Sequence, residues 1–137
     1  MEEQVDFILV GAYALGAHGY PRATVDIDIW VKPDEINSIN IYKALTRFGA
    51  PLEQIKINDF ATENIIFRIG VPPRRIDIIT KIDGVTYKEA DEDKILVEVE
   101  GLKLPVLSFD KLIKNKLSTG KEKDELDVKL LKKHKKS

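Results

Sequence analysis

Hydrophobic residues fall along the chain in short clusters that are typical of β-strands. Residues 7–10 form a continuous apolar run ending at Gly11, which favours a buried strand. Residues 25–31 alternate in polarity and are rich in β-branched side chains, as in a strand with two distinct faces. Four later clusters share this character. The predicted strands are residues 7–10, 25–31, 64–69, 75–80, 94–99 and 102–107.

Helical composition and end signals mark further segments between and after these strands. Residues 12–17 are rich in alanine and leucine, and Asp34 and Ser108 can each cap a following helix. The predicted helices span about residues 12–17, 35–48, 108–118 and 122–135. This order predicts an α+β fold, with a mixed or antiparallel sheet and flanking helices. A length of 137 residues suits a single domain over residues 1–137, with C-terminal helices at about 108–135.

The composition excludes several classes of protein and site. A hydrophobic share of 43% and a charged share of 33% indicate a folded, soluble domain. A net charge of -1 gives no general attraction to nucleic acid or anionic membranes. The absence of cysteine excludes disulfides and thiolate chemistry. No apolar run could span a membrane, and the acidic start is unlike a signal peptide. We therefore expect a cytoplasmic protein with no membrane partner.

The strand over residues 25–31 carries the candidate chemistry. Side chains alternate faces along a strand, so Asp26, Asp28 and Trp30 share one face, opposite an apolar face that faces the core. Two carboxylates at this spacing can converge on one Mg²⁺ ion. The other interpretation is a half-buried strand with a solvated outer face. Aspartate is depleted in strands, and like charges on one face repel each other, which favours a binding role.

A third carboxylate lies in a later strand. Asp77 is flanked by Ile76 and Ile78, so it points to the face opposite these isoleucines. If its strand lies beside residues 25–31, three carboxylates meet on one face and can hold two metal ions. Without metal, these carboxylates would repel each other. The alternative is that Asp77 forms a salt bridge with Arg74 or Arg75.

The segment Val10-Gly11-Ala12 connects a predicted strand to a predicted helix. Glycine permits a tight turn, and the start of the helix offers free N–H groups to a phosphate. Such a glycine is common in proteins that contain strands and helices, so this feature is weak evidence by itself.

Together these residues resemble the signature of the nucleotidyltransferase superfamily related to DNA polymerase β. That signature is a hydrophobic residue, Gly, then Gly or Ser, followed after about nine to thirteen residues by Asp-hydrophobic-Asp/Glu. Here Val10-Gly11-Ala12 is followed by thirteen residues and then by Asp26-Ile27-Asp28. The stretches over residues 9–24 and 114–127 are similar to small bacterial and archaeal nucleotidyltransferases near the AbiEii toxins.

The resemblance implies a role for each matching residue. Gly11 and Ala12 would contact the triphosphate of a nucleotide such as ATP. Asp26, Asp28 and Asp77 would be the catalytic residues and would hold Mg²⁺ or Mn²⁺. Asp77 would also help to activate the acceptor hydroxyl.

One departure from the signature bears on activity. Ala12 stands where the family usually has Ser or Gly, so a hydroxyl contact to phosphate is missing. Two functions remain open. The first is an enzyme that transfers a nucleoside monophosphate to a protein, RNA or small-molecule acceptor. The second is a catalytically weak binding partner in a toxin–antitoxin pair. A domain this small could also form a homodimer.

Four further residues could assist nucleotide binding. Arg22 and Thr24 precede the acidic strand, and the guanidinium of Arg22 suits a phosphate, although it could equally fix the loop. Lys116 lies on the apolar side of its predicted helix, where it either extends to solvent or points at an anion. Trp30 could stack on a base or simply cover the sheet.

Overall fold

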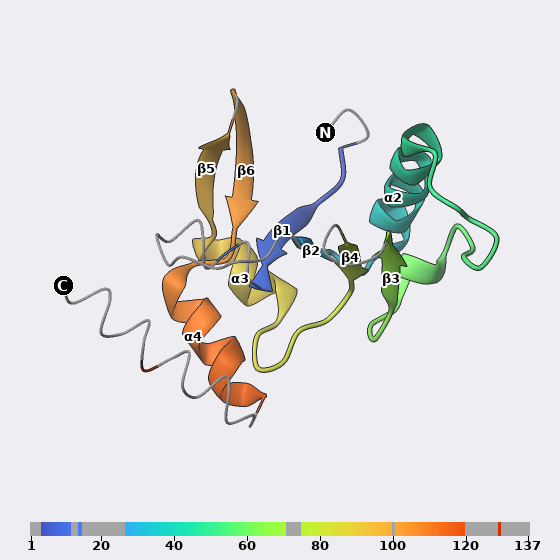
Figure 1. The fold of residues 1–137 in the computed structure, drawn as a ribbon. Coiled ribbons are helices and arrows are strands. Elements are labelled where there is room, and N and C mark those ends of the chain that lie inside the picture. The colour runs from blue at the N-terminus through green and yellow to red at the C-terminus, as the bar shows by residue number, and fades with distance from the viewer. Residues whose placement is uncertain are drawn as a thin grey trace.

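The fold is a mixed sheet with helices packed on both faces (Figure 1). The computed structural model describes residues 4–11, 14, 27–70, 75–99, 101–119 and 129. The strands are β1 (Phe7–Val10), β2 (Ile27–Val31), β3 (Ile66–Ile69), β4 (Ile76–Ile79), β5 (Ile95–Val99) and β6 (Leu102–Val106). Their order in the sheet is β3-β4-β2-β1-β6-β5. This confirms the predicted α+β class.

The sheet combines parallel and antiparallel pairs. Strand β2 pairs in parallel with β4, and β1 pairs in parallel with β6. The pairs β1/β2, β3/β4 and β5/β6 are antiparallel. As a result β2 lies at the centre, between β1 and β4.

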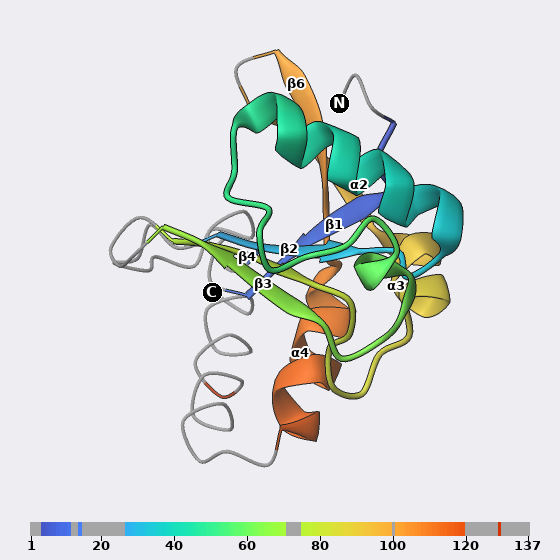
Figure 2. The same ribbon diagram turned by 90° about the vertical axis from the view of Figure 1, so that its right-hand side faces the viewer.

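Helix α2 (Glu35–Phe48) covers one face of the sheet (Figure 2). Its ends agree with the sequence, since Asp34 accepts a hydrogen bond from the backbone of Asn37 and Gly49 closes the helix in the left-handed conformation. The buried Asn37 side chain also hydrogen-bonds to the backbone of Asp6 and Lys32, which fixes α2 to the ends of β1 and β2. The core beneath α2 contains Val31, Ile41, Leu45, Phe60 and Ile78.

Helices α3 (Tyr87–Asp93) and α4 (Phe109–Ser118) enclose a second core. It contains Trp30 with residues of β1, β6 and both helices. The buried members are Ile8, Leu9, Val10, Ala14, Trp30, Val85, Ala90, Val106, Leu107 and Leu112. Figure 2 shows α4 on the side of the sheet opposite α2. No helix in the described part of the chain is long and apolar enough to cross a membrane.

The structure decides between the two roles that the sequence allowed for Trp30, which were stacking on a base and covering the sheet. Trp30 is only 1% exposed. Its ring packs edge-on against Tyr87 of α3, with centroids 5.2 Å apart. Trp30 therefore covers the sheet, and the base-stacking interpretation is wrong. The predicted helices over residues 12–17 and 122–135 lie largely outside the described residues, apart from Ala14 and Lys129.

Candidate active site

The acidic residues of β2 and β4 lie side by side at the centre of the sheet. Asp28 is the register partner of Asp77 across the parallel pair. Register partners on adjacent strands point to the same face, with their Cα atoms roughly 4.8 Å apart. Asp77 is 7% exposed, and Asp28 is half-buried. The structure therefore brings these two predicted residues together in a carboxylate pair.

Gly11 lies beside this pair because β1 is the other neighbour of β2. Val10 is the register partner of Asp28, and Gly11 follows it directly with a φ of +67°. A Cβ atom at position 11 would lie 2.2 Å from Oδ2 of Asp28, far inside any permitted contact. Glycine is thus needed here for its backbone conformation and for the approach of the Asp28 carboxylate.

Two arginines flank Asp77, Arg68 on the neighbouring strand β3 and Arg75 directly before β4. Nε of Arg75 lies 3.1 Å from Oδ1 of Asp77, and Nε of Arg68 lies 3.7 Å from Oδ2. The predicted salt bridge between Asp77 and Arg75 is therefore present, while Arg74 lies outside the described residues. These guanidinium groups offset the negative charge of the carboxylate pair. The strain that we expected from carboxylate repulsion is reduced accordingly.

Asp77 nevertheless keeps unused capacity to bind a cation. Its Oδ1 atom is buried and makes no hydrogen bond with the described residues, although it lies 3.1 Å from Nε of Arg75 in an ion pair. Buried carboxylate oxygens normally have a partner, and Mg²⁺ and Mn²⁺ prefer such oxygens as ligands. The donor atoms of Asp28 and Asp77 therefore fit a divalent cation. Within the described ranges, no group of three His, Cys, Asp or Glu side chains gathers around them.

Several predicted site residues cannot be placed around this pair. The residues outside the described ranges are Ala12, Arg22, Thr24 and Asp26. Asp26 precedes the first described residue of β2 by one position.

Lys116 is described, and it is one of the few buried charged residues. It is 9% exposed and lies one turn after the buried Leu112 of α4. This agrees with its predicted position on the apolar side of the helix.

Arg68 is a site residue that the sequence analysis missed. It is the register partner of Asp77 on β3, so Arg68, Asp77, Asp28 and Val10 form one row across four strands. The sequence did place Arg68 next to Phe67 in a predicted strand, so the two side chains were expected on opposite faces. Which of those faces carries Asp77 depends on the pairing of this strand with β4.

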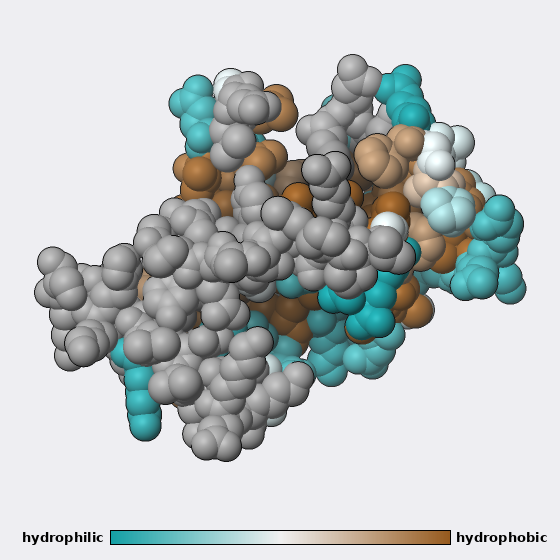
Figure 3. All heavy atoms as spheres, in the orientation of Figure 1, coloured by the Kyte–Doolittle hydropathy of each residue, from teal (hydrophilic) through white to brown (hydrophobic). Residues whose placement is uncertain are grey.

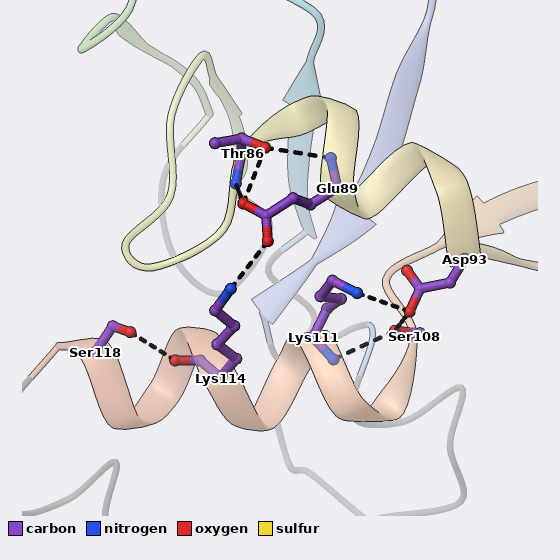
Figure 4. Close-up of polar contacts among 7 residues, drawn as sticks. All are labelled: Thr86, Glu89, Asp93, Ser108, Lys111, Lys114 and Ser118. Carbon is purple, nitrogen blue, oxygen red and sulfur yellow. Dashed lines mark hydrogen bonds and ion pairs between the residues drawn. The ribbon is translucent and has the colours of Figure 1, made fainter.

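Polar contacts join α3 to α4 (Figure 4). Glu89 of α3 accepts a hydrogen bond from Nζ of Lys114 at 2.9 Å and also completes a capping box with Thr86. Asp93 of α3 accepts hydrogen bonds from Ser108 and Lys111, each at 3.0 Å. Since both helices bury residues in the core that contains Val10 and Trp30, these contacts help to fix that face of the sheet.

Two pKa shifts follow from this arrangement. The hydrogen bond from Lys114, with those from Thr86, lowers the pKa of Glu89 to about 2. Burial, together with the nearby carboxylate of Asp91, raises the pKa of Tyr87 above its ordinary range. The Glu89 carboxylate is therefore charged at any physiological pH.

Comparison with solved structures identifies the architecture. The chain superposes on a proposed nucleotidyltransferase, TM1012 from Thermotoga maritima, with a TM-score of 0.62. The match covers 95% of this chain and 84% of that protein, at 20% sequence identity. This chain has a nucleotidyltransferase fold. No protein-family model and no curated protein matches it.

Proposed function

We propose that the protein is a metal-dependent nucleotidyltransferase. Its substrate is a nucleoside triphosphate, ATP among the candidates, and its product is an acceptor that carries the nucleoside monophosphate. The observation that carries the proposal is the register pairing of Asp28 with Asp77 directly beside Gly11. The similarity of fold to TM1012 supports it.

Asp28 and Asp77, together with Asp26 of the same sequence motif, would hold Mg²⁺ or Mn²⁺. The cation would supply positive charge that offsets the charge of the phosphates. The acceptor oxygen forms a bond to the α-phosphorus while the bond to the bridging oxygen breaks, and pyrophosphate leaves. Asp77 accepts the proton of the acceptor hydroxyl through a carboxylate oxygen. Catalysis is thus mainly positioning and charge neutralisation.

The triphosphate lies against the turn at Gly11 and Ala12 in this proposal. Small residues at these two positions favour close approach of a phosphate to the backbone, and N–H groups at the start of a helix can donate to phosphate oxygens. Arg22, Thr24 and Lys116 are the further candidates for phosphate contact. Arg68 adds positive charge on the same face, with its side chain 61% exposed.

The candidate acceptors are a protein, an RNA end and a small molecule. The resemblance of residues 9–24 and 114–127 to nucleotidyltransferases near the AbiEii toxins makes a partner protein in a cytoplasmic toxin–antitoxin pair one acceptor to test. A gene for a small helical toxin or antitoxin beside this one would support that assignment. Transfer of the nucleotide to that partner would establish it.

The test combines nucleotide binding with label transfer. Each of the four ribonucleoside triphosphates, labelled at the α-phosphate, is added with Mg²⁺ or Mn²⁺ to wild type, Asp28→Asn, Asp77→Asn and the control Glu53→Gln. Glu53 is exposed in the loop after α2, so its variant changes charge away from the site. We expect metal-dependent binding of a nucleotide by wild type and the control, and its loss in both aspartate variants.

Label transfer is read by mass shift on the protein and on candidate partners. An adduct of one nucleoside monophosphate, with release of pyrophosphate, is the expected product. If none of the four nucleotides binds in a metal-dependent manner, the proposal is wrong, whatever acceptor is supplied.

A further inference from the structure

The hairpin of β5 and β6 projects from one edge of the sheet (Figure 1). Its strands pair over five positions, from Ile95 with Val106 to Val99 with Leu102. Among the described residues, the hairpin is joined to the remaining sheet at the end of β6, where Val106 and Leu107 lie alongside Leu9. An isolated two-stranded ribbon is marginally stable in water, so this projection is a candidate for further pairing.

The outer edge of β5 is open in the described part of the chain. Strand β5 ends the sheet order, and no described strand pairs with its outer side. Natural edge strands are usually protected by charged side chains, proline or a bulge. Strand β5 has one charged residue, Glu98, but no Pro, and its register with β6 is unbroken.

Large hydrophobic side chains are exposed on this hairpin. Leu96 is 62% exposed, Leu102 is 65% exposed and Ile95 is 37% exposed. The space-filling view shows hydrophobic and hydrophilic side chains together on the projection (Figure 3). An edge that combines unpaired backbone groups with apolar side chains is suited to addition of another strand.

The sequence of this edge is complementary to itself. If two copies of β5 pair in antiparallel fashion about a two-fold axis at Leu96, Lys94 faces Glu98 of the second copy, and Ile95 faces Val97. Leu96 then faces its own equivalent on the axis. At each end of the pairing a lysine thus faces a glutamate, and the centre of the pairing is apolar. Both features favour cross-strand pairing.

We propose that β5 is a homodimer interface, in which two copies join edge to edge about Leu96 and form one continuous sheet. The partner is a second copy because this one register matches the charges at both ends and the apolar residues between them. The inner strand β6 is less suited to the same role, since Pro105 has no N–H to donate. This proposal is independent of the proposed enzyme activity.

Charge reversal tests the register as well as the surface. Lys94→Glu places two glutamates opposite each other at both ends of the pairing, and Glu98→Lys places two lysines there. Each variant alone should raise the dimer dissociation constant by about tenfold or more, since two attractive pairs become repulsive. An equimolar mixture of the two variants should recover dimers, because both cross-strand pairs are then opposite in charge again.

The measurement is sedimentation velocity of the full chain over a range of concentrations. Glu53→Lys serves as the matched control, because it makes the same charge change as Glu98→Lys at an exposed loop position. Melting curves confirm that each variant is folded, a necessary check because Lys94 contacts Asp91 in its own chain. A monomeric wild type at the highest concentration, an unchanged dimer in both variants, or a mixture that stays monomeric would each overturn the proposal.

Discussion

At the scale of single residues, the candidate site depends on Asp28 and Asp77 in adjacent strands and on Gly11 directly after a third strand. Asp28 and Asp77 face the same way because their strands are parallel and in register. Gly11 is small because the Asp28 carboxylate occupies the space where a side chain would begin. Arg75 and Arg68 reduce the cost of the paired negative charges. Each of these relations gives a substitution with a defined expected effect.

The variant Asp77→Asn separates the two roles of this carboxylate. It removes the ion pairs to Arg75 and Arg68, so the free energy of unfolding without metal should fall by about 1 kcal/mol. This loss lies between those typical of exposed and of buried ion pairs. Transfer activity should fall by about 10²-fold or more, because a charge that acts in the transition state is lost. Thermal melts and pyrophosphate release measure the two effects. Lower stability with unchanged activity would leave Asp77 a purely structural residue.

The variant Gly11→Ala should be destabilising, by about 1–2 kcal/mol for the left-handed backbone with a further cost for the contact with Asp28. In an Asp28→Ala background the steric part is removed, because the Oδ2 atom is absent. The same glycine substitution should therefore cost less there. Urea unfolding of the four proteins in this double-mutant cycle gives the coupling energy. Equal costs in both backgrounds would contradict the observed approach of Gly11 and Asp28.

At the scale of elements, the sequence was sufficient to predict where the strands lie along the chain, but not which strands pair with one another. Alternation identified the face of Asp28 and that of Asp77 separately, because the period of a strand is local. Their pairing depends on a parallel connection through α2 and β3, which no local pattern specifies. Helix α3 was missed because only Ala90 within it is buried, so it lacks apolar periodicity. Its capping box, Thr86 with Glu89, was the available signal.

The burial of Trp30 illustrates the same limit. The pattern of β2 indicated one apolar and one polar face, and Trp30 fell with the acidic residues on the polar one. In the structure α3 and α4 cover that end of the face, so both sides of β2 are packed near Trp30. Two-sided packing depends on where later helices return to the sheet. The strand sequence alone could not show it.

The contact between α3 and α4 should make stability depend on pH in the acid range. The pKa of Glu89 is about 2 in the folded protein, against an ordinary value of 4.5. Its stabilising effect is therefore complete above about pH 4.5 and is lost as the pH falls towards 2. Wild type and Glu89→Gln should differ in unfolding free energy above pH 5 and converge near pH 2. Urea titrations across this range test the effect, and a constant difference at all pH values would contradict it.

At the scale of the whole molecule, metal and nucleotide should stabilise the fold. A ligand that binds only the folded state raises the unfolding free energy by about 2.7 kcal/mol at one hundred times its dissociation constant. Mg²⁺ with the preferred nucleotide should therefore raise the melting temperature of wild type by several degrees. The melting temperature of Asp28→Asn should rise little on addition of Mg²⁺ and nucleotide, and that of Glu53→Gln should rise as much as that of wild type. A response of equal size in Asp28→Asn would place the ligand elsewhere.

The most direct test of the account is whether Asp28 and Asp77 share one divalent cation. Binding of Mn²⁺ can be followed by electron paramagnetic resonance in the presence of a nucleoside triphosphate analogue that cannot transfer its nucleotide. We expect tightly bound Mn²⁺ in wild type and Glu53→Gln, and loss of this tight binding in both Asp28→Asn and Asp77→Asn. Tight Mn²⁺ binding with unchanged affinity in either aspartate variant would contradict the shared site.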